Sequence, residues 1–198
     1  MAGRRHAVIA AVLPAVLGLA AAAAADDKGK GDALKPGTVP AGIPLELKVT
    51  ADKDTYPAVP SPQIGAKDSP PPEVSLTLEL RNTGDKEIAV TASGDPFVVL
   101  LDLQGPGAVT AVLQRVFTRE FRMGRREVLA PGANVKIPLN SLAFGFRGRS
   151  NAAYWTRPGE YKLTVAVQTQ MHAPPDKDEA VKVRVTAEPV TIKVIEAK

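Results

Sequence analysis

The chain has 198 residues, with 25 Lys and Arg against 21 Asp and Glu, and 44% of it is apolar. It contains no cysteine, which excludes disulfides, thiolate zinc sites and a thiol nucleophile. Beyond residue 25 no apolar run approaches the ~20 residues that cross a bilayer, which excludes a multi-span membrane protein. The length favours one domain that can bury a core.

Residues 1–25 have the three parts of an export signal. Arg4 and Arg5 provide a charged start, residues 7–19 an apolar run, and residues 23–25 a small-residue cleavage site. We therefore expect a cleaved signal peptide and a periplasmic or extracellular protein with no transmembrane domain after cleavage. Retention of the segment as a membrane anchor and transport by the twin-arginine route are the alternatives.

The rest of the chain divides into a linker and a domain. Residues 26–42 are rich in Gly, Lys, Asp and Pro without apolar periodicity, which predicts a flexible linker. From Leu45 onward apolar and polar residues alternate with the period of a strand. The predicted strands cover residues 45–50, 74–81, 88–92, 97–101, 109–117, 135–139, 161–168, 181–185 and 190–194.

No window of the domain carries a helical stripe, and the predicted strands are separated by turn residues. Seven to nine strands at this spacing predict an all-β fold. We expect an antiparallel β-sandwich of the immunoglobulin-like or fibronectin-III-like kind that spans residues 43–196 as one domain.

Six prolines lie between residues 57 and 72, in the stretch between the first two predicted strands. Proline lacks the backbone N–H that a sheet interior requires, so we expect a stiff surface connection. A polyproline ligand for an aromatic groove is the alternative.

Three short segments with turn chemistry follow one another along the domain. They are Arg81-Asn82-Thr83-Gly84 within the strand-turn-strand unit 76–90, Leu129-Ala130-Pro131-Gly132, and Pro158-Gly159-Glu160-Tyr161. Their order and spacing across about residues 45–170 resemble the bacterial immunoglobulin-like domains of the intracellular proteinase inhibitor (BsuPI-type) group. The resemblance implies an immunoglobulin-like sandwich. The chain departs from that group in its export signal, Pro-rich stretch and Arg-rich middle, and no inhibitory loop is assigned to particular residues.

Residues that could form a catalytic centre are scarce. After the signal peptide the single histidine is His172, which we expect to be a solvated residue of a loop over 170–179. No Gly-x-Ser-x-Gly elbow is present, and Asp102 has no identifiable acid-base partner. We predict that the protein is not an enzyme and has no catalytic residues.

Metal and cofactor sites are equally poorly supported. Met123, Met171 and His172 form too thin a donor set for copper. Two acidic clusters, Asp52 with Asp54 and Asp176 with Asp178 and Glu179, lack the spacing of a calcium-binding EF-hand loop. We therefore expect no metal ligands and no cofactor.

Positive charge is concentrated in the middle of the domain. Residues 115–157 contain nine basic and two acidic residues, a net charge of +7, and six of the nine aromatic residues. Arginine binds carboxylate, sulfate or phosphate through paired hydrogen bonds and stacks on aromatic faces. The candidate contacts for an anionic partner are Arg115, Arg119, Arg122, Arg125, Arg126, Arg147, Arg149, Arg157 and Trp155. The alternative is that these arginines lie on several faces and pair with acidic residues elsewhere.

These patterns favour an exported, non-catalytic binding module that contacts an envelope or extracellular macromolecule, such as an anionic polysaccharide or an acidic protein. Nucleic acid is not expected, because export separates the protein from it. The first alternative is a secreted protease inhibitor that presents residues 57–72 or 117–126 to a protease. The second is a metal-binding protein or metal-dependent enzyme.

Overall fold

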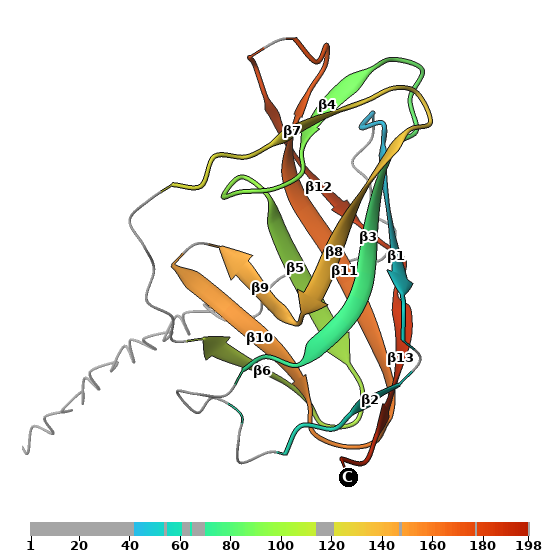
Figure 1. Ribbon diagram of the computed structural model, residues 1–198, viewed down its shortest axis with the longest axis vertical. Coiled ribbons are helices and arrows are strands. Elements are labelled where there is room, and N and C mark those ends of the chain that lie inside the picture. The colour runs from blue at the N-terminus through green and yellow to red at the C-terminus, as the bar shows by residue number, and fades with distance from the viewer. Residues whose placement is uncertain are drawn as a thin grey trace, which may run out of the picture. The chain divides into compact units, whose positions relative to one another are not determined.

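The computed structural model describes residues 42–53, 55–60, 64, 70–113, 121–146, 148–176 and 178–197. The predicted signal peptide and nearly all of the predicted linker lie outside these residues. The described chain is all-β with no helix, which confirms the predicted fold class (Figure 1). It has thirteen strands, so the predicted number of seven to nine was too low. The strands are β1 (Leu45–Ala51), β2 (Thr55–Pro57), β3 (Glu73–Asn82), β4 (Ile88–Thr91), β5 (Val98–Gln104), β6 (Ala108–Leu113), β7 (Arg126–Leu129), β8 (Asn134–Ser141), β9 (Ala143–Phe146), β10 (Arg149–Trp155), β11 (Gly159–His172), β12 (Val181–Thr186) and β13 (Val190–Ile195).

One layer of the sandwich is sheet A, in which β3 lies between β1 and β8 and pairs antiparallel with both. Strand β3 shows the alternation expected from its sequence, because Val74, Leu76, Leu78 and Leu80 are buried. A strand turns successive side chains to opposite faces, so these four form a single apolar row.

The other layer is sheet B, which is built around the 14-residue strand β11. One edge of β11 pairs with β13 and then β12, and the other edge pairs with β5 and then β4. Strand β2 extends the sheet beyond β13, and β7 extends it beyond β4. Residues 163–167 are buried on both faces of the strand.

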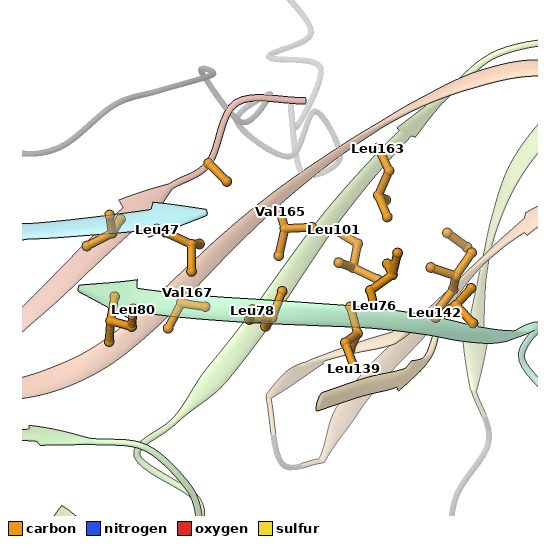
Figure 2. Packing of buried hydrophobic residues seen from close by; sticks show 14 of the residues in the cluster. Leu47, Leu76, Leu78, Leu80, Leu101, Leu139, Leu142, Leu163, Val165 and Val167 are labelled. Carbon is orange, nitrogen blue, oxygen red and sulfur yellow. The ribbon is translucent and has the colours of Figure 1, made fainter. Parts of the chain in front are cut away.

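The hydrophobic core lies between sheets A and B. Figure 2 shows Leu76, Leu78 and Leu80 of β3 facing side chains of sheet B. The sheet B residues that meet them include Leu101 of β5 and Leu163, Val165 and Val167 of β11. The apolar rows predicted from the alternation thus pack against each other between the two sheets.

A smaller sheet C, in which β10 lies between β6 and β9, continues from sheet A. The N–H of Ala153 in β10 donates to the carbonyl of Leu142, directly after β8, at 3.0 Å. Residues 152–155 of β10 are all buried and show no alternation, and the sequence did not predict this strand. The predicted strand over 109–117 corresponds to β6, which ends at Leu113, and residues 114–120 lie outside the described residues.

Part of the Pro-rich stretch is tied to the fold. Strand β2 pairs in parallel with β13 at the outer edge of sheet B, where Pro57 is tolerated. The ring of Tyr56 lies 5.4 Å from the ring of Trp155, centroid to centroid. The Tyr56 hydroxyl also accepts a hydrogen bond from the N–H of Ser75 in β3, at 3.1 Å. One side chain thus links the edge of sheet B to sheet A.

Tyr161, near the start of β11, forms a tyrosine corner of the kind found in immunoglobulin-like sandwiches. Its hydroxyl lies within hydrogen-bonding distance of the carbonyl oxygens of Arg157, at 2.8 Å, and of Pro106. Its ring centroid lies 6.1 Å from that of Trp155. Burial raises the pKa of Tyr161 above its ordinary value of 10.0, and the backbone and charge of Arg157 oppose that rise only in part.

We predict that Leu78→Ala lowers the free energy of unfolding by about 3 kcal/mol, because it removes buried methyl groups and leaves a cavity between the sheets. Urea unfolding of the two proteins measures the difference. The control is Lys48→Ala on the exposed face of β1, which should change stability by less than about 0.5 kcal/mol. Equal losses in the two variants would contradict the assigned core.

We also predict that stability falls as Tyr161 ionises at high pH. A raised pKa in the folded state means that the unfolded chain loses the phenolic proton first, so the contribution is complete below pH 10.0 and is lost above it. Unfolding free energies measured from about pH 9 to about pH 11 test this. Tyr161→Phe should be less stable at neutral pH but depend less steeply on pH in that range. Parallel profiles for the two proteins would refute the assignment.

Candidate interaction surface

The structure describes five of the eight candidate arginines and does not place them together. Arg115, Arg119 and Arg147 lie outside the described residues. The described ones form one group, Arg122, Arg125 and Arg126, and two separate residues, Arg149 at the start of β10 and Arg157 just before β11. Two of them pair with acidic residues, but only Asp178 lies outside residues 115–157, as the alternative requires. Arg125 pairs with Glu127, and Arg126 lies 3.8 Å from the carboxylate of Asp178.

Arg126 and Arg157 lie near opposite ends of β11. Arg126 pairs with Thr91 of β4, and β4 pairs with the last two residues of β11. Arg157 precedes Gly159, the first residue of that strand. Fourteen residues of strand span about 40 Å, so Arg126 and Arg157 cannot contact the same small ligand. Figure 1 shows β4 and β7 at one end of β11 and β2 at the other.

The assignment of Trp155 to the contact surface is wrong. Its side chain is 1% exposed and lies in the core, between the rings of Tyr56 and Tyr161. Its indole Nε1–H donates to the carbonyl of Pro57 at 2.9 Å. The number of aromatic residues in the segment 115–157 did not indicate whether their side chains point to solvent or to the core. Trp155 points to the core.

The group of three arginines belongs to a segment that we call the arginine loop, residues 121–126. Its backbone is fixed to the turn between β4 and β5. The N–H of Ala92 donates to the carbonyl of Arg125 at 2.9 Å, and the N–H of Asp95 donates to the carbonyl of Arg122 at 3.0 Å. In return, Arg122 and Arg125 donate their N–H groups to the side chains of Asp95 and Ser93. Four hydrogen bonds therefore hold the loop against the sheet.

Two glycines allow this close backbone contact. Gly94 has φ +78°, and a Cβ there would meet the carbonyl oxygen of Met123 at 2.6 Å and that of Arg122 at 2.7 Å. A Cβ on Gly124 would meet Thr91 at 2.4 Å and the carbonyl oxygen of Ser93 at 2.9 Å. Any other residue at these positions would force the two segments apart.

The arginine loop turns its side chains outward. Phe121 is 61% exposed, Met123 is 83% exposed, and the side chain of Arg125 is 77% exposed. Aromatic, Met and Arg side chains are the types enriched at protein interfaces. Chemically, the arginine loop offers guanidinium groups for anions beside apolar side chains that a partner can cover.

A second feature, which the sequence analysis missed, is a groove of about 430 Å³ on the face of sheet B that points away from the core. We call it the outer groove. Its polar floor comes from adjacent strands, with Gln168 and Gln170 on β11 and Lys182 and Arg184 on β12. Its remaining lining residues are Asp95, Pro96, Val98, Phe146, Thr169 and Val183.

The sequence contained a signal for this groove. Val181, Val183 and Val185 alternate with Lys182, Arg184 and Thr186, so a strand must turn the two cations to the side opposite its apolar row. However, the predicted contact surface was based on the net charge of residues 115–157, and Lys182 and Arg184 lie outside that segment. Only pairing with β11 brings them beside two glutamines.

The predicted surroundings of His172 are wrong. We expected a solvated loop residue, but His172 is the last residue of β11, pairs with Ala89 of β4 and is 1% exposed. The strand runs four residues beyond the predicted end because β12 and β4 pair with that part of it.

The acidic clusters lie on the surface, as far as they are described. The carboxylate of Asp52 accepts hydrogen bonds from the hydroxyls of Ser75 and Thr77, both at 3.3 Å. Asp178 is the partner of Arg126. Among the described residues no group of three or more His, Asp or Glu could hold a metal ion. No helix in that part of the chain is long and apolar enough to cross a membrane.

We predict that Gly94→Ala lowers the free energy of unfolding by about 3 kcal/mol, because the new methyl group collides with two carbonyl oxygens of the arginine loop. Gly132→Ala is the matched control, since Gly132 has φ +77° and only one side-chain atom, at 3.9 Å, within contact of an added Cβ. It should cost only about 1 kcal/mol of backbone strain. Urea unfolding measures both variants. A difference near zero would show that the loop is not held by close backbone packing.

Comparison with solved structures finds a likeness in fold at low sequence identity. Among solved structures, the chain is similar to the ASH / PapD-like domain of human CEP192 (PapD-like domain 7), with 17% sequence identity and a TM-score of 0.27. The match covers 83% of this chain and 94% of that domain. No protein-family model matches the chain, and no curated protein matches it. The resemblance to the BsuPI-type group therefore stays a prediction.

Proposed function

We propose that this protein is an exported, non-catalytic β-sandwich that binds an anionic macromolecule at the cell envelope or outside the cell, with the arginine loop as its contact. One observation carries the proposal. The loop is fixed to the β4–β5 turn through its backbone and presents Phe121, Met123 and Arg125 to solvent. Export rests on the predicted signal peptide.

Fixing the backbone before binding favours association. Binding costs free energy when a loop must be ordered, and a loop already ordered avoids most of that cost. Here four hydrogen bonds and the close approach at Gly94 set the conformation in advance. Only the arginine side chains must then change conformation to bind a partner's carboxylate, sulfate or phosphate groups.

The surroundings of the arginines suit an external anion. Arg125 pairs with Glu127 and Arg126 with Asp178, but these pairs lie at the surface, where solvent weakens them. A partner that presents several anionic groups can displace such contacts at little cost.

Two alternatives from the sequence stay predictions. A protease inhibitor would use the same exposed segment, and its fixed backbone is the observation that favours this alternative. A panel of serine and metalloproteases assayed with the purified protein tests it. A metal-binding role has no supporting observation among the described residues.

We predict that the purified protein binds anionic polymers, here polyglutamate and polygalacturonate, and that the triple variant R122Q/R125Q/R126Q binds at least one of them about tenfold more weakly. Affinity should fall as salt is raised from about 0.05 M to about 0.5 M, because salt screens contacts between exposed charges. Fluorescence anisotropy of labelled polymer measures both effects.

The control is K48Q/R81Q/K193Q, which removes the same charge from exposed positions on β1, β3 and β13. It should retain most of the affinity if the arginine loop is the contact. Equal losses in the two triple variants would show that only net charge matters. Absent or salt-insensitive binding to both polymers would overturn the proposal.

A further inference from the structure

The outer groove has a regular array of polar side chains at its floor. Gln168 of β11 pairs with Arg184 of β12, and Gln170 pairs with Lys182. Adjacent strands lie about 5 Å apart, and alternate residues along a strand lie about 7 Å apart. The result is a two-by-two arrangement in which each amide lies beside a cation.

The walls of the groove add an aromatic ring and a carboxylate. Phe146, at the end of β9, lines one wall and is 51% exposed. Val98 of β5 pairs with Gln168 on the other side of β11 and adds apolar surface. Asp95 also lines the groove, and its carboxylate accepts the N–H of Arg122 at 3.1 Å.

This lining matches the chemistry of an acidic sugar. Side-chain amides both donate and accept hydrogen bonds, as sugar hydroxyls require, and a carboxylate accepts from hydroxyls. The cations of Lys182 and Arg184 complement the acid group. The half-exposed aromatic ring of Phe146 offers apolar surface for the C–H face of a pyranose ring. A volume of about 430 Å³ lies within the range of small-ligand sites.

An acidic peptide fits the same surface less well. An extended peptide gains most of its affinity by hydrogen bonding to a free strand edge. The groove floor is instead the face of two strands whose backbone groups pair with each other over residues 166–171 and 181–186. It therefore offers a peptide side chains but no free strand edge to pair with.

We propose that the outer groove binds one or two residues of an acidic polysaccharide, with Lys182 and Arg184 holding the carboxylate, Gln168 and Gln170 the hydroxyls, and Phe146 the ring face. This inference rests on the proposed function and names the class of its anionic partner. The contact of Asp95 with Arg122 places the groove directly beside the arginine loop. A polysaccharide chain can thus occupy the groove and continue across the loop.

The test is a calorimetric titration of the purified protein with tetragalacturonate, neutral maltotetraose and tetraglutamate. We expect tetragalacturonate to bind more tightly than tetraglutamate, whose carboxylates can reach only the arginine loop, and we expect no binding of maltotetraose. Lys182→Gln, Arg184→Gln and Phe146→Ala should each weaken that binding about five- to tenfold. These side chains lie at the surface of the groove, and unchanged melting temperatures would show that the variants remain folded.

Lys162→Gln is the matched control for Lys182→Gln. Lys162 is exposed on the same face of β11 as Gln168, about 20 Å along the strand, and its change removes the same charge. It should bind tetragalacturonate like the unaltered protein. Equal effects of Lys162→Gln and Lys182→Gln, or equal affinity for tetraglutamate, would overturn the inference.

The outcome also separates this inference from the proposed function. If tetragalacturonate does not bind but polyglutamate still binds through the arginine loop, the saccharide site is refuted and the proposed function stands. If no anionic probe binds, both are refuted.

Discussion

Backbone pairing along both edges of β11 is the constraint on which the rest of the structure depends. Four strands, β4 and β5 from earlier in the chain and β12 and β13 from directly after it, pair with this one strand. One face of β11 supplies Leu163, Val165 and Val167 to the core. The opposite face supplies Gln168 and Gln170 to the outer groove. The strand therefore positions the candidate site and stabilises the sandwich at once.

The parts of the fold that alternation specifies were predictable, and the others were not. Strands such as β3 and β13 face a core on one side and solvent on the other, so their sequences alternate. Strand β10 is buried at four successive residues, and β7 is four residues long with charged residues at its start. These strands exist because neighbouring strands pair with them, and that information is not local to their sequences.

The candidate site was predictable only in its charge. Counting residues identified an Arg-rich segment, but the direction in which each side chain points depends on the strand to which the residue belongs. Trp155 turned inward to the rings of Tyr56 and Tyr161, and Arg157 came to lie at the far end of β11. Lys182 and Arg184, outside that segment, gained partners through cross-strand pairing. The alternation of apolar and polar residues shows which side chains are buried. Which polar side chains come together can be known only from the order in which the strands pair.

The two faces of β11 are subject to different constraints, because one packs in the core and the other lines the outer groove. At its β12-paired end, Thr169 and Met171 are buried, whereas Gln168 and Gln170 are partly exposed and form the floor of the outer groove. Specificity and stability are therefore encoded at alternating positions of one short peptide. Exchanges at residues 168, 170, 182 and 184 therefore change the chemistry of the outer groove without repacking the interior between the sheets.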